Sequence, residues 1–351
     1  MDTLTHALSG ALLARATASR DAPPRSVPRR IAAGFFAAAA PDLDFVLAFV
    51  SPLVYLEQHR GPTHSLVLLP LWALVFSWVL ARILREPDGK TAGWRALYGI
   101  TALGLGAHIL GDLITSFGTI IFAPVSDARF AWGTTFIIDL WFTGIIVAGL
   151  IASLAWRRVR VPAIAASLVL VAYVGFQAVL REQALDFARD YARTQGLQAV
   201  QISAYPRAVS PFNWTVYASD ELAHRYAHVN LRREVPLPAA HDFIGRMDAA
   251  FLPPAHAQWE TRARYGASAE EQEVARSAWA SPALGFMRWF AGLPAFDGLS
   301  AGSTCAWFVD LRFLNPGRDW LPFRYGACQE RPGGPWRAFE RLEGTARQAL
   351  D

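Results

Sequence analysis

The sequence predicts an all-α polytopic membrane domain of about five to six helices, followed by a soluble α+β domain. Of its 351 residues, 53% are hydrophobic and only 18% are charged, and long apolar runs are concentrated in the first half. Several of these runs approach the ~20 residues that a bilayer span requires. The second half mixes short strand-like and helical segments. We therefore expect a membrane domain at 1–181 and a soluble domain at 182–351.

The first half divides into six apolar segments. The clearest is 65–84, which has the length and composition of a bilayer span. Residues 96–116 form another span, which is rich in glycine and carries His108 and Asp112. The other helical segments are expected at 4–14, 31–50, 135–156 and 161–180.

Basic residues gather in alternate connections between these segments. The connections at 15–30, 82–95 and 157–160 are basic, whereas 51–64 and 117–134 carry one arginine each. Because cytoplasmic loops collect Lys and Arg, this alternation places the N-terminus and the two less basic connections on the non-cytoplasmic side. The direction of the last span then predicts an extracytoplasmic C-terminal domain.

The second half has the pattern of a water-soluble α+β domain. An amphipathic helix at 181–196 follows the last span, and residues 267–280 also have a helical pattern. Alternating apolar residues predict strands at 213–217, 224–231, 305–314 and 323–329. Cys305 and Cys328 are the two cysteines; an oxidising compartment would allow one disulfide, and the sequence leaves this open.

Composition argues against two kinds of site. The chain has no basic tract interleaved with aromatic residues, so nucleic acid is not an expected partner. It has no C-x-x-C pair, which argues against a zinc site built from thiolates. His224 and His228 fall on one face of a predicted strand, and we expect that face to be solvated.

A polar turn at 55–66, YLEQHRGPTHSL, precedes the clearest span. It carries His59, Arg60 and His64 in a stretch broken by glycine and proline. Ionisable groups at a bilayer boundary are costly and therefore indicate a functional site. The up-and-down course of the predicted helices brings more such groups to the same outer depth: His6, Asp42, Asp44, His108, Asp112 and Asp139.

These side chains have the composition of a metal site without sulfur ligands. His108 and Asp112 are four residues apart on a helix and therefore point to one side. Imidazole and carboxylate ligands suit zinc, or another divalent metal such as manganese or iron. Asp42 and Asp44 lie roughly opposite each other on a helix, so one of them is expected to bind the metal. We favour Asp44 as the ligand, with Asp42 supporting the site or binding a second ion.

Structural interpretations of the same residues stand beside this one. A single histidine within the membrane, such as His6, is commonly a hydrogen-bonded packing residue. His59 is a ligand, a partner of a ligand or a general base, and Arg60 is a phosphate clamp or an arginine at headgroup level. Helix capping is the favoured role of Asp139. Each of these interpretations can explain its own residue. Together they do not explain why so many potential metal ligands lie at the same depth in the membrane.

Four motifs in residues 1–140 carry a resemblance to a known family. LTHALSGALLA, PDLD, HRGPTHSL and GAHILGDLITSFGTIIFAPVS, in this order, resemble the YdjM-like family of LexA-regulated inner-membrane metal-dependent hydrolases. That family is distantly similar to zinc-dependent phospholipase C, an all-helical enzyme with clustered zinc ions. The resemblance implies that the metal ligands include His6, one of Asp42 and Asp44, His64, His108 and Asp112. Further downstream ligands of the superfamily have no counterpart, so one or two ions are expected.

We therefore expect a metal-dependent hydrolase of the bacterial inner membrane that cleaves a phosphoester of a lipid or lipid-linked substrate at the periplasmic face. Its cofactor is expected to be zinc or manganese. The expected metal ligands are His6, Asp44, His64, His108 and Asp112, and the expected catalytic residues are His59, Arg60 and Asp42. One alternative is a non-enzymatic membrane protein that binds or transports metal ions. Another is a membrane anchor for an envelope-binding C-terminal domain.

Overall fold

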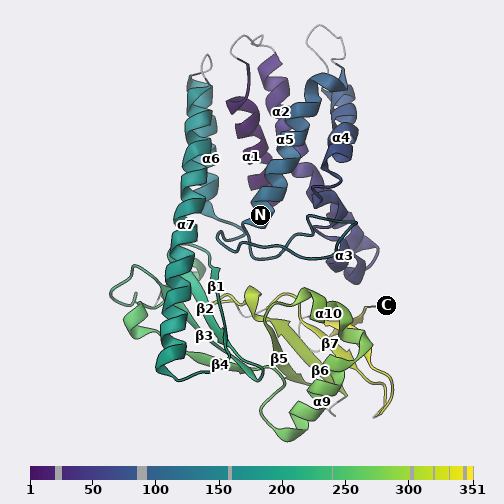
Figure 1. Ribbon diagram of the computed structural model, residues 1–351, viewed down its shortest axis with the longest axis vertical. Helices are drawn as coiled ribbons and strands as arrows, with labels where there is room; N and C mark the ends of the chain where they lie inside the picture. The colour runs from purple at the N-terminus through teal and green to yellow at the C-terminus, as the bar shows by residue number, and fades with distance from the viewer. Residues whose placement is uncertain are drawn as a thin grey trace. The chain divides into compact units, whose positions relative to one another are not determined.

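Helices build the first half of the chain and two antiparallel sheets build the second, which confirms the predicted fold class (Figure 1). The computed structural model describes residues 1–19, 26–84, 93–156, 160–238, 240–300, 304–318, 321–331, 333–342 and 346–350. Contacts divide the chain into two units. The first is Met1–Val50 with Val54–Val179, and the second is Ser51–Leu53 with Leu180–Asp351.

The described residues of the first unit form helices and the connections between them, with one isolated strand-like bridge between Thr119 and Phe130. Its long helices lie side by side (Figure 1). In chain order the elements are α1 (Thr3–Ala16), α2 (Ser26–Ala39), η1 (Ala40–Phe49), α3 (Pro52–Gln58), η2 (Pro62–His64), α4 (Leu69–Ile83), α5 (Trp94–Leu113), α6 (Leu140–Ala155) and α7 (Val161–Thr194).

Three helices of the described chain are long and apolar enough to cross a membrane: Ser26–Phe49, Trp94–Leu113 and Val161–Thr194. A fourth span results if Pro52–His64 and Leu69–Ile83, which meet at a bend of 84°, are counted together. The span expected at 65–84 is therefore broken at its start. The polar HRGPTH stretch forms a turn and a short 3-10 helix, and the regular helix begins at Leu69.

Glycines allow α1, α2 and α5 to approach one another closely. A Cβ atom on Gly10 would lie 2.1 Å from the Gly34 carbonyl oxygen, and one on Gly34 would lie 2.4 Å from the Gly10 carbonyl oxygen. A Cβ atom on Gly104 would lie 3.1 Å from the same Gly34 oxygen. Small residues permit this kind of helix contact in membranes. The crossing fixes the positions of the three helical segments that carry the polar residues described below.

Arginines bind exposed helix carbonyls at one end of this bundle. Arg30 donates from Nε to the Ala14 carbonyl oxygen at 3.2 Å, and Arg29 donates from Nε to that of Leu84 at 2.6 Å. Arg160 donates to the Ala18 carbonyl oxygen at 2.9 Å. The last carbonyls of a helix lack partners within it, and basic side chains can satisfy them. Three of the described basic residues therefore hold the ends of α1 and α4.

The second unit contains two antiparallel sheets, and α7 continues into it. The first sheet has the order β1-β2-β3-β4 and the second β5-β6-β7-β8-β9. Leu180, Leu185 and Ala188 of α7 pack on the first sheet around the buried Trp214. The strands are β1 (Gln201–Pro206), β2 (Asn213–Ser219), β3 (Ala223–Asn230), β4 (Glu260–Ala263), β5 (Pro294–Leu299), β6 (Cys305–Asp310), β7 (Tyr325–Cys328), β8 (Arg337–Arg341) and β9 (Arg347–Ala349).

The short helices of this unit are α8 (Phe243–Ala249), α9 (Ala269–Ala280) and α10 (Gly285–Phe290). The predicted helix at 267–280 corresponds to α9, where Ser268 and Glu271 form a capping box. Short 3-10 turns occur at η3 (Pro254–His256), η4 (Pro282–Leu284) and η5 (Leu311–Phe313).

Two side-chain contacts of the second unit bear on the sequence predictions. Cys305 and Cys328 face each other on β6 and β7 and form a disulfide. His224 is buried, and its imidazole bonds the Ser219 hydroxyl and the Pro294 carbonyl oxygen, each at 2.8 Å. The expectation of a solvated strand face is therefore wrong for His224. The second sheet covers that face, and alternation along one strand does not reveal such a cover.

We expect Gly34→Ala to lower the melting temperature of the detergent-purified protein. Alanine normally favours a helix over glycine by about 1 kcal/mol. Here its methyl group would overlap the Gly10 carbonyl oxygen and destabilise the protein by about 1–3 kcal/mol. Gly144→Ala in α6 is the matched control, because no described atom lies within 4 Å of its Cβ position. Equal melting temperatures for the two variants would contradict the close crossing.

Candidate metal centre

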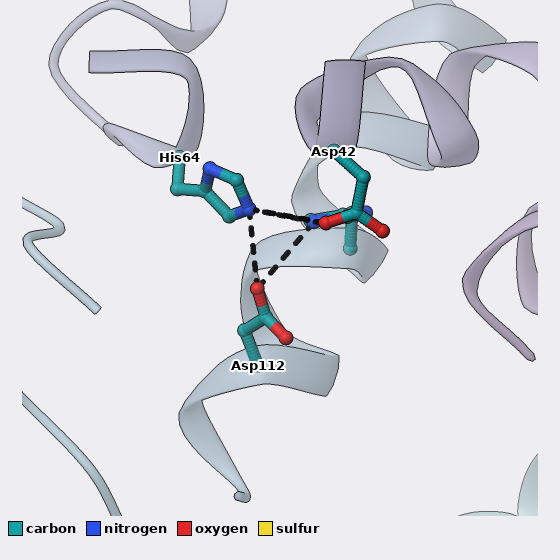
Figure 2. A group of neighbouring side chains, drawn as sticks. Asp42, His64 and Asp112 are labelled. Atoms are coloured by element: carbon teal, nitrogen blue, oxygen red, sulfur yellow. Dashed lines mark hydrogen bonds and ion pairs between the residues drawn. The ribbon is translucent and has the colours of Figure 1, made fainter. Parts of the chain in front are cut away.

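Three helical elements bring four potential metal ligands together in the first unit. Asp42 lies in η1, His64 ends η2, and His108 and Asp112 lie one turn apart on α5. One ligand atom of each residue lies within 4.8 Å of those of the other three. Figure 2 shows His64 and the carboxylates of Asp42 and Asp112 pointing toward one another. We refer to these four residues as the Asp42 cluster.

The imidazoles present their Nε2 atoms to this cluster. The Nε2 atoms of His64 and His108 are 2.9 Å apart. Asp112 Oδ2 lies 3.2 Å from His64 Nε2 and 3.5 Å from His108 Nε2. Asp42 Oδ1 lies 3.8 Å and 3.5 Å from the same two nitrogens. Ligand atoms around a tetrahedral zinc ion are about 3.4 Å apart, so the four atoms have suitable separations.

The hydrogen bonds of the other imidazole nitrogens show which Nε2 atoms carry lone pairs. His108 Nδ1 lies 2.6 Å from the Ala38 carbonyl oxygen, which can only accept. His64 Nδ1 lies 2.9 Å from the Thr63 hydroxyl, whose own proton is donated to Asp44 Oδ2 at 3.1 Å. Both Nδ1 atoms are therefore donors. In neutral imidazoles both Nε2 atoms then carry lone pairs directed at each other.

Asp42 and Asp112 each direct one oxygen toward the imidazoles of His64 and His108. Other groups of the protein bind the second oxygen of each carboxylate. The Thr3 hydroxyl donates to Asp42 Oδ2 at 2.6 Å. Arg60 Nη2 lies 2.9 Å from Asp112 Oδ1, and His6 Nε2 lies 3.1 Å from it. The Met1 amino group also contacts Asp112 Oδ1, and burial lowers the pKa of this group to about 6. Asp112 Oδ2 is buried and has no hydrogen bond, which leaves it available to a cation.

A divalent cation fits this set of atoms. Two imidazole lone pairs and two carboxylate oxygens are ligands that zinc and manganese accept. Without a positive charge between them, the two nitrogens and the unbonded carboxylate oxygen would repel one another in a buried site. A proton shared by the two imidazoles would be the other way to relieve this repulsion. Metal analysis separates the two.

His59 and Asp44 form a pair beside the Asp42 cluster. His59 Nδ1 lies 2.8 Å from Asp44 Oδ1, and the imidazole ring lies 6.0 Å from that of His64. Asp44 Oδ2 also accepts hydrogen bonds from the Arg60 amide and the Thr63 hydroxyl, each at 3.1 Å. This one carboxylate therefore holds three residues of the HRGPTH turn in place.

Comparison with known proteins assigns the chain to a family. The model of the YdjM inner membrane protein family matches residues 1–184, which is more than half of the chain. The chain belongs to the YdjM inner membrane protein family. It is also 28% identical, over 183 residues, to the uncharacterized protein YfhP of Bacillus subtilis (strain 168). That match covers 51% of this chain and 53% of YfhP, so it spans about half of each protein. No solved structure matches the chain.

Every residue of the Asp42 cluster lies within the segment that the YdjM model matches. The structure groups Asp42, and not the favoured Asp44, with His64, His108 and Asp112. His6 lies outside the group: its ring stacks on that of His108 at 3.7 Å, and it bonds Asp112 Oδ1. Asp44 and His6 therefore lie beside the Asp42 cluster and contact its surroundings, and the metal contacts expected of them stay predictions.

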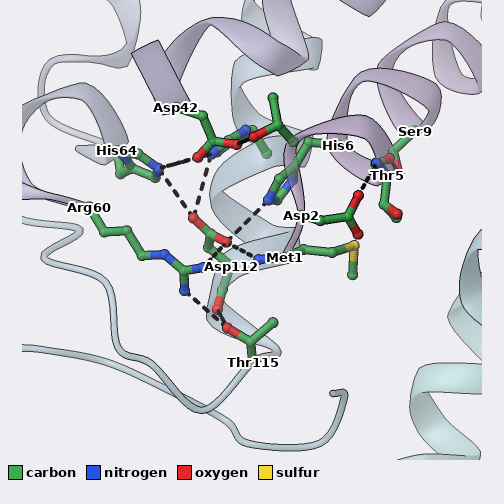
Figure 3. Close-up of polar contacts among 12 residues, drawn as sticks. Met1, Asp2, Thr5, His6, Ser9, Asp42, Arg60, His64, Asp112 and Thr115 are labelled. Carbon is green, nitrogen blue, oxygen red and sulfur yellow. Dashed lines mark hydrogen bonds and ion pairs between the residues drawn. The ribbon is translucent and has the colours of Figure 1, made fainter. Parts of the chain in front are cut away.

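Arg60 and Asp139 are held by contacts within the protein. Arg60 is buried, and its Nη1 donates to the Thr115 hydroxyl at 3.0 Å, while Nη2 binds Asp112 (Figure 3). The guanidinium of Arg60 is therefore held by protein partners, and the phosphate contact expected of it stays a prediction. Asp139 caps α6 by accepting from the amides of Trp141 and Phe142, as the sequence indicates.

Three partners of the cluster were not predicted from the sequence: the Thr3 hydroxyl, the Met1 amino group and the Ala38 carbonyl oxygen. The carbonyl oxygen of Ala38 fixes the His108 tautomer, and a backbone carbonyl has no signature in sequence. The Thr115 hydroxyl donates to the Asp112 carbonyl oxygen at 2.8 Å. Ser65, at the end of the polar turn, accepts from the amides of Val67 and Leu68 and so stabilises the turn that precedes α4.

We expect Asp42→Asn and His108→Ala to lose bound zinc or manganese, because each removes one ligand atom from the cluster. The measurement is elemental analysis of detergent-purified protein. Asp44→Asn should weaken metal binding by about 10–100-fold without abolishing it, since Asp44 supports His64 through Thr63. Asp139→Asn is the matched control and should retain the metal.

The same measurement can reject this assignment. Full metal content in Asp42→Asn, together with complete loss in Asp44→Asn, would restore the ligand choice made from the sequence. Absence of any divalent metal from the unmodified protein would favour the shared proton between His64 and His108.

Proposed function

We propose that this YdjM-family protein is a membrane-bound, metal-dependent hydrolase that cleaves a phosphoester of a lipid or lipid-linked substrate at the non-cytoplasmic face. The observation that carries the proposal is the convergence of two imidazole lone pairs and two carboxylate oxygens in the Asp42 cluster. Such a ligand set is typical of metal centres that act on phosphate esters. The ligands lie in helices of membrane character, which favours a lipid over a soluble nucleotide.

The metal in this proposal is zinc or manganese, held by Asp42, His64, His108 and Asp112. When bound, such an ion polarises a phosphoryl oxygen and makes water a better nucleophile. Asp42 has 13% of its side chain exposed, whereas the other three side chains are fully buried. Substrate therefore reaches the centre from the side of Asp42.

His59 is the residue best arranged to move a proton. Its Nδ1 donates to Asp44, which leaves Nε2 with the lone pair that a general base requires. The Asp44 carboxylate orients the ring and would stabilise the imidazolium that forms when Nε2 takes a proton. The His59 side chain is 15% exposed, so it is accessible in a way that the ligand histidines are not. His59 is accordingly assigned as the general base, with Asp44 as its positioning residue.

Arg60 acts on the substrate indirectly in this proposal. Its guanidinium binds Asp112 and Thr115, so it holds the Asp112 carboxylate and offsets its negative charge. A salt bridge this deeply buried needs such further hydrogen bonds to compensate for the loss of solvation. Arg60 is therefore a positioning residue for a metal ligand, in place of the phosphate clamp predicted from the sequence.

An extracytoplasmic C-terminal domain is also part of the proposal. The Cys305–Cys328 disulfide supports it, because disulfides persist in oxidising compartments and are rare in the cytosol. The distribution of basic residues along the sequence supports the same orientation.

We expect His59→Ala to lower kcat for phospholipid hydrolysis by about 10²–10⁴-fold while leaving the metal content unchanged. The reason is that His59 lies outside the Asp42 cluster but next to it. Hydrolysis of a phospholipid in mixed micelles gives kcat, and elemental analysis of the same sample gives the metal. His256→Ala in the second unit is the control and should keep both.

Two results would count against the role assigned to His59, and a third would count against the hydrolase itself. His59→Ala protein with unchanged kcat would remove the assigned base. Loss of metal in that variant would make His59 a ligand. Metal flux through proteoliposomes, with no hydrolysis of phospholipids or polyprenyl phosphates by the unmodified protein, would favour a metal transporter.

The orientation is tested by reporter fusions to the C-terminus. We expect fused alkaline phosphatase to be active, because that enzyme folds with disulfides outside the cytoplasm. Green fluorescent protein fused at the same position should not fluoresce, because it is exported unfolded and does not then reach its fluorescent form. The opposite pattern would place the second unit in the cytoplasm.

A further inference from the structure

An apolar crevice opens between α2–η1 and α4 in the first unit. Phe36, Ala39, Ala40 and Leu43 line one side, and α4 residues from Phe76 to Ile83 line the other. The crevice has a volume of about 270 Å³. The first four residues are spaced as one face of a helix, and the two alanines in the middle are too small to fill the space between the segments. The crevice is therefore a consequence of the local alanine-rich sequence.

The crevice runs from the metal centre toward the opposite end of the bundle. Leu43, at one end of the crevice, is the chain neighbour of Asp42, the residue of the cluster with exposed surface. At the other end, Arg29 at the start of α2 bonds the carbonyl oxygen of Leu84, the residue that follows Ile83. The segment α2–η1 and helix α4 are thus antiparallel along the crevice.

Its lining also faces the surroundings of the protein. Phe36 and Leu43 each expose about half of their surface, at 49% and 56%. In a helix of membrane character, such surface contacts lipid chains. The crevice presents apolar atoms almost exclusively, so neither a headgroup nor a soluble polar substrate is suited to it.

We propose that this crevice binds one acyl chain of a lipid whose phosphate lies at the Asp42 cluster. The inference rests on the proposed hydrolase and specifies its substrate as a lipid of the leaflet on the metal side. The polar group would reach the cluster past Asp42, and the chain would extend along α4 toward Ile83. Ala39 and Ala40 then determine specificity, because they leave the space for the chain.

The first test fills the crevice. Val79 lines it and is half-buried, so Val79→Trp should place an indole in the space of the chain. We expect kcat/KM for a long-chain phosphatidylglycerol to fall about tenfold or more, with little change for a short-chain, water-soluble homologue. Val75→Trp is the matched control: it substitutes the same residue type one turn away on α4, outside the lining. Equal effects on both substrates, or no effect on either, would overturn the proposal.

The second test requires no hydrolysis and uses the unmodified protein. Phosphatidylglycerol with a diazirine on its acyl chain is incorporated into phosphatidylglycerol vesicles with the full-length chain and irradiated. We expect crosslinks, located by mass spectrometry, on Phe36, Phe76 or Ile83. Crosslinks there without any hydrolase activity would support the chain site and reject the proposed reaction. Crosslinks spread evenly over the apolar helices would reject the chain site, whether or not the protein is a hydrolase.

Discussion

The site in the first unit is organised around the Nε2 atoms of His64 and His108, which face each other at 2.9 Å inside an apolar helical bundle. The Ala38 carbonyl oxygen and the Thr63 hydroxyl hold the two rings so that neither can present a proton to the other while both are neutral. Three carboxylates, those of Asp42, Asp44 and Asp112, and the guanidinium of Arg60 surround the two rings. Buried charge of this kind needs compensation, and one divalent cation would provide it.

Close helix packing makes this approach of the two imidazoles possible. The contact of Gly10 with Gly34 sets the distance between α1 and α2, and the contact of α2 with Gly104 sets that between α2 and α5. The polar residues follow toward one end of these helices, and the arginine contacts to helix carbonyls lie at the other. A larger side chain at the crossing would separate the helices before it touched any ligand. Stability and metal binding are therefore linked through residues that carry no functional group.

Much of the site follows from residue type and spacing. The helical fold of the first half, the polar turn and the i,i+4 relation of His108 and Asp112 are all visible in the sequence. The sequence does not show which of Asp42 and Asp44 joins the two histidines and Asp112. On a helix the two side chains point to different sides, whether the turn is α or 3-10, and apolar neighbours flank both. Which side faces α5 is decided by the packing of α1 on α2, a long-range contact that local spacing does not encode.

Arg60 shows how a sequence motif can identify a residue of the site without identifying its protein partners. A guanidinium next to a predicted phosphate site suggests a clamp, but this one is buried against Asp112. Arg60 has a φ of 60°, in the left-handed region that residues other than glycine seldom adopt. Its amide donates to Asp44 and its side chain binds Asp112 and Thr115, so both ends of the residue maintain this conformation. Backbone strain retained at such a point is typical of functional sites. The Arg60 backbone thus orients the His59 pair while its side chain orients a metal ligand, which couples the proposed base to the proposed metal through a single residue.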